Sequence, residues 1–188
     1  GASAGELKSE YKQAQAMIDR AVQDKLFMRY MDGFKQVIMT GEIEGVPIKM
    51  KMDSTDGRRI TDLKTVEGIN KAFWIPGLGR KANFIEYWGY DIQAAVYREI
   101  YRQNTGDTLP FYIAAISKDK TNNVPHPRLA VIEIPDYLMD DKLEEFKADI
   151  GRIADLKAGL IEPIHCGSCD YCADTEDLKG VISMDSLL

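Results

Sequence analysis

The feature that most constrains this chain is a pair of alternating apolar and polar runs, Val46–Asp53 and Arg58–Thr65, on either side of an Asp56-Gly57 pair. Alternation with a period of two is typical of β-strands. Asp-Gly between two such runs predicts a hairpin with a two-residue turn, because that turn needs positive φ at both central positions. The chain is therefore expected to build an antiparallel sheet around this hairpin.

The pairing within the hairpin decides which side chains share a face. A two-residue turn places Asp53 opposite Ile60 and Lys51 opposite Asp62, and cross-strand partners lie on one face of the sheet. One face then carries the charged residues Lys49, Lys51, Asp53, Asp62 and Lys64, and the other carries the apolar residues Ile48, Met50, Met52 and Leu63.

The charged face has the residue types of a metal site. Asp53 and Asp62 become diagonal neighbours, about 7–8 Å apart at Cα, so both carboxylates can reach one divalent cation such as Mg²⁺ or Mn²⁺. Lys64, on the same face, could orient or deprotonate a metal-bound water or offset charge on a phosphate. The alternative is an ordinary solvent-facing strand pair with a Lys51–Asp62 ion pair, and the pattern alone favours that alternative.

Helical and strand periodicities alternate along the rest of the chain. They predict an α/β fold in which helices flank a mixed central β-sheet, in the order α-βββ-α-ββ-α. With no repeat or linker, residues 1–188 are interpreted as one domain with a cysteine-containing tail at 163–188. The predicted helices are 5–30, 83–104 and 136–159, the predicted strands are 36–44, 46–53, 58–65, 111–117 and 129–134, and 66–82 is predicted to be an irregular loop.

Composition narrows the function classes. The 188 residues carry a net charge of −6, which excludes a basic nucleic-acid-coating protein but leaves an enzyme with an acidic metal site and local basic patches. No apolar run approaches the roughly 18 residues of a membrane span, and the first residues lack a signal-peptide core. We expect a cytoplasmic protein with no membrane partner.

Asp53 followed by Asp62-Leu63-Lys64 at a hairpin's distance resembles the split motif of the PD-(D/E)xK nuclease superfamily. The helix that follows contains Gln93 and Tyr97 at i and i+4, which is similar to the Gln-x-x-x-Tyr motif of RecB-like nucleases. The run from 41 to 101 resembles phage-type exonucleases related to RecE and lambda exonuclease, and also the Cas4-like group. The resemblance implies a restriction-endonuclease-like fold.

The resemblance also implies roles for individual residues. Asp53, Asp62 and the Leu63 carbonyl would bind the metal, and Lys64 would be the catalytic lysine. Gln93 and Tyr97 would support the site or the DNA strand near it. A further acidic ligand would come from Glu42, Glu44 or Glu10, and the sequence does not decide among these three.

The predicted loop between hairpin and helix combines basic and aromatic residues, which can bind phosphates and stack on bases. Its DNA-binding candidates are Lys71, Trp74, Arg80 and Lys81, and the alternative is a surface loop anchored by its aromatic residues. In the helix, Trp88 falls on the i+4 stripe of Phe84 and Ile92 and is predicted to be core.

The three cysteines, Cys166, Cys169 and Cys172, are too few and too clustered for a disulfide framework. A zinc site or an iron–sulfur cluster needs a fourth ligand. The chain has no upstream cysteine, and His165 is geometrically awkward beside Cys166. The sequence thus favours a structural tail over a metal site. If a metal does bind here, its role would be to hold the tail against the domain.

The favoured function is a Mg²⁺- or Mn²⁺-dependent deoxyribonuclease, an exonuclease of phage-type DNA recombination or repair. By the same resemblance it could form a homo-oligomeric ring and act with a recombination partner protein. The alternatives are a Cas4-like or repair nuclease on single-stranded ends, and an inactive DNA-binding module that retains the nuclease fold.

Overall fold

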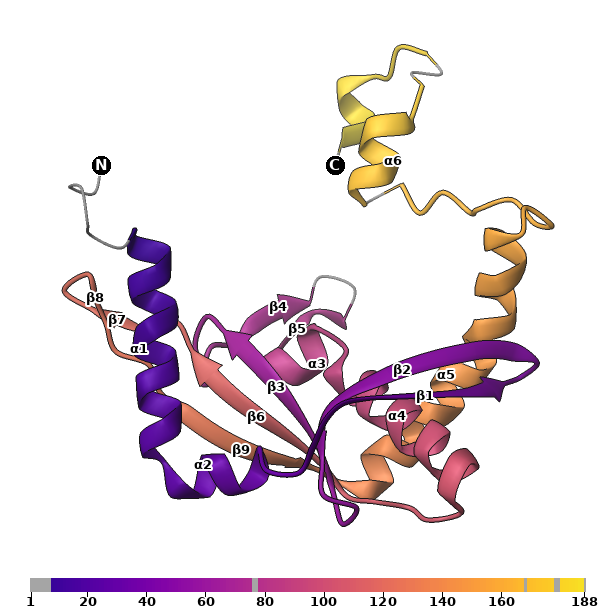
Figure 1. The fold of residues 1–188 in the computed structure, drawn as a ribbon. Helices are drawn as coiled ribbons and strands as arrows, with labels where there is room; N and C mark the ends of the chain where they lie inside the picture. The colour runs from indigo at the N-terminus through magenta and orange to yellow at the C-terminus, as the bar shows by residue number, and fades with distance from the viewer. Residues whose placement is uncertain (1–7, 76–77, 168, 178–179, 188) are drawn as a thin grey trace. The chain divides into compact units, whose positions relative to one another are not determined.

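The computed structural model describes residues 8–75, 78–167, 169–177 and 180–187 (Figure 1). The chain divides into two compact units, Gly1–Gly151 and Arg152–Leu188, and each is described by itself. The interpretation of 1–188 as one domain with a tail stays a prediction. No helix in the described ranges is both long enough and apolar enough to cross a membrane.

The first unit is built on a mixed β-sheet, as the sequence predicts. Its strands follow the order β1-β2-β3-β6-β9, in which β3 and β6 are parallel and the other neighbours are antiparallel. The α/β prediction of a mixed central sheet flanked by helices is confirmed. The strands are β1 (Phe34–Ile43), β2 (Val46–Thr55), β3 (Ile60–Val66), β6 (Phe111–Ser117) and β9 (Leu129–Ile134).

Two of the predicted helices are each split in two. Asp24 ends the first helix because its side chain accepts hydrogen bonds from the backbone N–H groups of Leu26 and Phe27, and so caps a new helix. Gly89, at a φ of +67°, interrupts the second. The helices of this part are α1 (Ser9–Gln23), α2 (Lys25–Tyr30), α3 (Phe84–Tyr87), α4 (Tyr90–Thr105) and α5 (Asp136–Lys157).

The helices cover the two faces of the sheet differently. Ala94 and Ile100 of α4 join one core cluster with Ile60 of β3 and Ile113 of β6. The helices α1 and α2 lie on the opposite face, over β3, β6 and β9 (Figure 1). One face of β3 therefore meets α4 and the other meets α1 and α2.

Short elements occupy segments that the sequence predicts to be irregular. Within 66–82, β4 and β5 pair as a small antiparallel hairpin, and β7 and β8 do the same between β6 and β9. These elements are β4 (Phe73–Ile75), β5 (Arg80–Ala82), β7 (Lys120–Thr121) and β8 (Val124–Pro125), and the second unit adds α6 (Asp170–Thr175) and a 3-10 helix, η2 (Met184–Leu187).

Candidate active site

The turn between β2 and β3 is longer than predicted. The described pairs are Thr55 with Ile60 and Ser54 with Thr61, so the loop has four residues. Asp56 explains the difference, because its Oδ1 accepts hydrogen bonds from the N–H groups at positions 58 and 59, at 3.0 Å each. Its side chain thus caps the loop, and it does not adopt the positive φ that a two-residue turn requires.

This turn corrects the predicted register by two residues. Ile60 lies opposite Thr55, not Asp53, and the same register puts Asp62 level with Asp53, so the predicted Lys51–Asp62 partnership is wrong. A shift of two leaves the parity of the strands unchanged. Asp53 and Asp62 therefore still come together, although not as diagonal neighbours.

Asp53, on β2, accepts hydrogen bonds from residues of both neighbouring strands, β1 and β3. It lies opposite Gln36 of β1, which has a φ of +54°. Gln36 Nε2 donates to Asp53 Oδ1 at 2.9 Å, and the Leu63 N–H donates to Asp53 Oδ2 at 2.9 Å. The carboxylate is thus held in place from β1 and from β3.

Asp62, Lys64 and Gln93 form a closed polar triangle. Gln93 Nε2 donates to Asp62 Oδ1 at 2.9 Å, and Lys64 Nζ donates to Gln93 Oε1 at 2.8 Å. Lys64 Nζ also lies 2.7 Å from Asp62 Oδ2. The amide of Gln93 thereby fixes both the carboxylate and the ammonium group, each of which comes from β3.

The break at Gly89 brings the first turn of α4 to this triangle. The Tyr90 ring centre lies 4.3 Å from Lys64 Nζ, a cation–π contact that the sequence analysis missed. Two turns after Tyr90 along α4, the Tyr97 ring packs edge-on against Phe111, with centroids 6.3 Å apart. The described contacts therefore place Gln93 in the site and Tyr97 in packing beside it.

The electrostatics of the cluster favour an added cation. Asp62 is only 3% exposed, and this burial raises the pKa of its carboxyl group, against the lowering effect of Lys64 and with a further rise from the charge of Asp53. Its Oδ2 has the Lys64 ammonium group, at 2.7 Å, as its partner. Two carboxylates against one ammonium group leave a net negative site, and carboxylate oxygens are the ligands of Mg²⁺ and Mn²⁺.

The candidate further acids lie elsewhere in the first unit. Glu42 is exposed, pairs with Pro47, and stands six residues along β1 from Gln36, about 20 Å at the usual rise per residue. Glu44 occupies the β1–β2 turn, and Glu10 is exposed in the first turn of α1. The structure brings none of these three side chains to Asp53 and Asp62.

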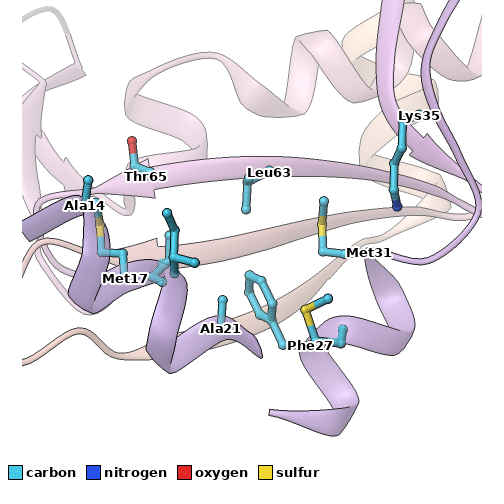
Figure 2. Close-up of a pocket in the computed structure, with 11 residues that line it drawn as sticks. Ala14, Met17, Ala21, Phe27, Met31, Lys35, Leu63 and Thr65 are labelled. Atoms are coloured by element: carbon cyan, nitrogen blue, oxygen red, sulfur yellow. The ribbon is translucent and has the colours of Figure 1, made fainter. Parts of the chain in front are cut away.

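The opposite face of β3 borders an apolar pocket. Leu63 does not join Met50 and Met52 in the core as predicted; it is 41% exposed and lines a pocket of about 400 Å³ under α1 and α2. Figure 2 shows Leu63 pointing toward Phe27 across this pocket. Its side chain therefore takes no part in the polar cluster, and only its backbone can serve the site.

The β4–β5 hairpin arranges the predicted DNA-binding residues unequally. Trp74 pairs directly with Lys81, so the two side chains share a face, and both are exposed. Arg80 instead forms an ion pair with Glu86, and Lys71 forms one with Glu67. Trp74 and Lys81 are therefore the better placed of the four to meet a nucleic acid.

An exposed aromatic cluster adjoins this hairpin and corrects one prediction. Trp88 is 59% exposed, not core, because the break at Gly89 removes it from the helical stripe. Its ring lies 4.9 Å from that of Tyr87, which stacks on Phe73 at 4.6 Å. The end of α3 thus adds exposed aromatic surface beside the β4–β5 hairpin.

In the second unit the three cysteines converge. The sulfur atoms of Cys166, Cys169 and Cys172 lie within 4.8 Å of one another. His165, which was expected to be badly placed, has its Nδ1 3.9 Å from the Cys172 Sγ.

The fold and the first-unit site together define a class. A mixed sheet whose central hairpin joins two aspartates and a lysine, with a glutamine from the next helix, is the arrangement of a PD-(D/E)xK nuclease-like domain. The chain belongs to the family described as "PDDEXK-like domain of unknown function", which matches residues 1–175. The predicted superfamily is thus confirmed.

A solved structure agrees with this assignment. The crystal structure named "Putative exonuclease" from Eubacterium rectale is 43% identical in sequence, with a TM-score of 0.83, over 99% of this chain and 68% of that chain. The search of curated proteins gave no match. Family and structural neighbour together support a nuclease.

Proposed function

We propose that this protein is a metal-dependent deoxyribonuclease, an exonuclease that hydrolyses DNA phosphodiester bonds in phage-type recombination or repair. The observation that carries the proposal is the convergence of Asp62 and Lys64 on the amide of Gln93, with Asp53 held beside them by the Leu63 N–H. The name of the Eubacterium rectale structure favours exonuclease action over internal cutting.

Asp53 and Asp62, with the backbone carbonyl of Leu63, would hold the divalent cation. The buried carboxylate of Asp62 fits such a ligand, and so does the net negative charge of two carboxylates against the one ammonium group of Lys64. When bound, Mg²⁺ or Mn²⁺ supplies a Lewis acid for the phosphate and lowers the pKa of a coordinated water.

The chain's own residues would divide the remaining work. Lys64 offers a positive charge near the two carboxylates, where it can orient the attacking water and stabilise the charge that develops on the phosphate. Gln93 fixes the side chains of Lys64 and Asp62 relative to each other by hydrogen-bonding to both. Tyr90 covers the ammonium group and limits the directions it can take.

DNA would reach the site through the β4–β5 hairpin. Trp74 can stack on an unpaired base, and Lys81 beside it can neutralise a phosphate. A chain with a net charge of −6 needs such a local contact, and a ring of several copies would concentrate these contacts around the DNA. The ring remains part of the proposal.

A nuclease assay tests the proposal. End-labelled linear duplex DNA and closed circular DNA are incubated with Mg²⁺ or Mn²⁺ and the wild-type protein, Lys64→Ala or the control Lys49→Ala, which alters an exposed lysine on β2 opposite Thr40. We expect the linear DNA alone to be degraded, by the wild type and the control but not by Lys64→Ala.

Other outcomes contradict specific parts of the proposal. Cutting of the circle would indicate an endonuclease on the same fold, and degradation restricted to single-stranded ends would favour the Cas4-like alternative. Folded protein that cleaves no DNA with either metal would indicate an inactive DNA-binding module.

A further inference from the structure

The described residues of the second unit form no apolar core that would hold it together. Among those from 152 to 185, only Cys172 is buried, at 3% exposure. A unit of fewer than about 40 residues seldom folds without a disulfide, a metal or a partner. The large apolar residues that stay exposed here are Ile153, Leu160, Ile161, Ile164, Tyr171, Val181, Ile182 and Met184.

What the unit does bring together is a set of metal-binding atoms. The Cys166 and Cys172 sulfurs are 3.8 Å apart, and Cys169 completes a trio within 4.8 Å. His165 adds a ring nitrogen 3.9 Å from the Cys172 sulfur. Three sulfurs and one imidazole nitrogen are one of the ligand sets of structural zinc sites.

The spacing of these atoms distinguishes zinc from an iron–sulfur cluster. With Zn–S bonds of about 2.3 Å, two sulfurs of a tetrahedral site are about 3.8 Å apart, and a sulfur and a nitrogen are about 3.6 Å apart. The 3.8 Å between the Cys166 and Cys172 sulfurs matches this tetrahedron, the 3.9 Å between the His165 nitrogen and the Cys172 sulfur is about 0.3 Å longer, and all three sulfurs lie within 4.8 Å. A four-iron cluster spreads its thiolates over separate irons and takes four cysteines, whereas this chain has three.

The local backbone explains how four nearby residues can face one centre. Gly167 has a φ of +70°, a conformation that favours glycine, and it turns the chain between Cys166 and Cys169. Cys169 is the N-cap residue of α6, and Cys172 lies in the helix itself. The loop therefore supplies His165 and Cys166, while the start of α6 supplies the other two ligands.

We propose that His165, Cys166, Cys169 and Cys172 bind one zinc ion, and that this ion stabilises the fold of the second unit. Four protein ligands fill a tetrahedral shell and leave no open position for substrate, so the site is structural. The proposal does not depend on nuclease activity, since it concerns residues of the second unit alone.

Metal content of the full chain, purified under reducing conditions, tests the proposal. After dialysis, elemental analysis by mass spectrometry is expected to find about one zinc per chain, either as purified or after addition of Zn²⁺. A chelator should then expose the second unit to limited proteolysis, while the fragment that contains β1 to β9 stays resistant.

Matched variants identify the ligands. His165→Ala and Cys166→Ser change exposed side chains, so loss of packing does not explain their effect, and each should weaken zinc binding by more than about ten-fold. His165→Cys should retain zinc, because cysteine is an alternative ligand. The control His126→Ala replaces the chain's other histidine, which lies in the first unit, and should leave the zinc content unchanged.

Three results would overturn the proposal. Iron and acid-labile sulfide in place of zinc would indicate a cluster. A chain that binds no zinc even after Zn²⁺ is added under reducing conditions would show that the thiols and the imidazole are not a metal site. Zinc content unaffected by His165→Ala and Cys166→Ser would place the ion elsewhere.

Discussion

Replacing Gln93 tests whether the polar triangle is the working part of the site. Gln93→Leu keeps a side chain of similar size and removes two hydrogen bonds, each to a charged group. Such bonds contribute about 1.5–3 kcal/mol each, but Asp62 and Lys64 keep one another as partners and Lys64 is partly exposed to water. We therefore expect a loss of about 2–3 kcal/mol in the free energy of unfolding.

The same change should affect turnover. Residues that orient a metal ligand typically contribute 10- to 100-fold to metal affinity or activity, so Gln93→Leu should slow DNA degradation by about that factor. The loss should shrink as Mn²⁺ is raised if Gln93 acts mainly through Asp62, and should persist at saturating Mn²⁺ if it acts mainly through Lys64.

The assay combines initial rates of nucleotide release over a Mn²⁺ series with urea unfolding in the absence of metal. Gln23→Leu, at an exposed position at the end of α1, is the matched control for the substitution itself. Rates within about two-fold of wild type at every Mn²⁺ concentration would refute the role assigned to Gln93. An unchanged free energy of unfolding would refute the hydrogen-bond argument.

Four further predictions concern other parts of the first unit. Trp74→Ala should weaken binding of DNA with unpaired ends by about 1–3 kcal/mol. Lys81→Ala should reduce the slope of log K against log salt concentration by about one, which is the loss of one phosphate contact. Fluorescence anisotropy over a salt series measures both effects. Met52→Ala leaves a cavity at a fully buried position and should cost about 2–5 kcal/mol in urea unfolding. Burial raises the pKa of Asp91, so the contribution of this group to folding stability should fall as pH rises from 3.8 through the raised value. Asp91→Asn should remove this contribution and be the more stable protein at neutral pH, as judged by thermal unfolding.

Much of the site could be predicted because strand parity is robust. The predicted turn at Asp56-Gly57 has the wrong length, yet a shift of two residues still brings Asp53 and Asp62 together. The Glu44-Gly45 turn between β1 and β2 carries a second signal for the site. Glu44 and Gly45 both have positive φ in a two-residue turn, and the register from that turn places Gln36 opposite Asp53.

Other features depend on contacts between segments that are distant in the sequence. The ring of Tyr90 meets Lys64 only because the helix breaks at Gly89, and the same break moves Trp88 to the surface. Glycine in a helical pattern signals a break, but the pattern does not say which residues the new helix start will meet. Those contacts come from the packing of α4 on the sheet.

The surroundings of Asp62 decide between the two interpretations of the charged strands. A solvent-facing ion pair would leave Asp62 exposed, but it is buried, and Ile60 and Val66, which share its face of β3, belong to the apolar core. Replacing a buried ion pair with apolar residues of similar volume is often neutral or stabilising, so stability alone does not explain Asp62 and Lys64 at this place. A buried carboxylate beside a second carboxylate, with the single ammonium group of Lys64 against their two negative charges, suits a site for a cation. The location of these two residues therefore favours catalysis over structure more strongly than their spacing in the sequence does.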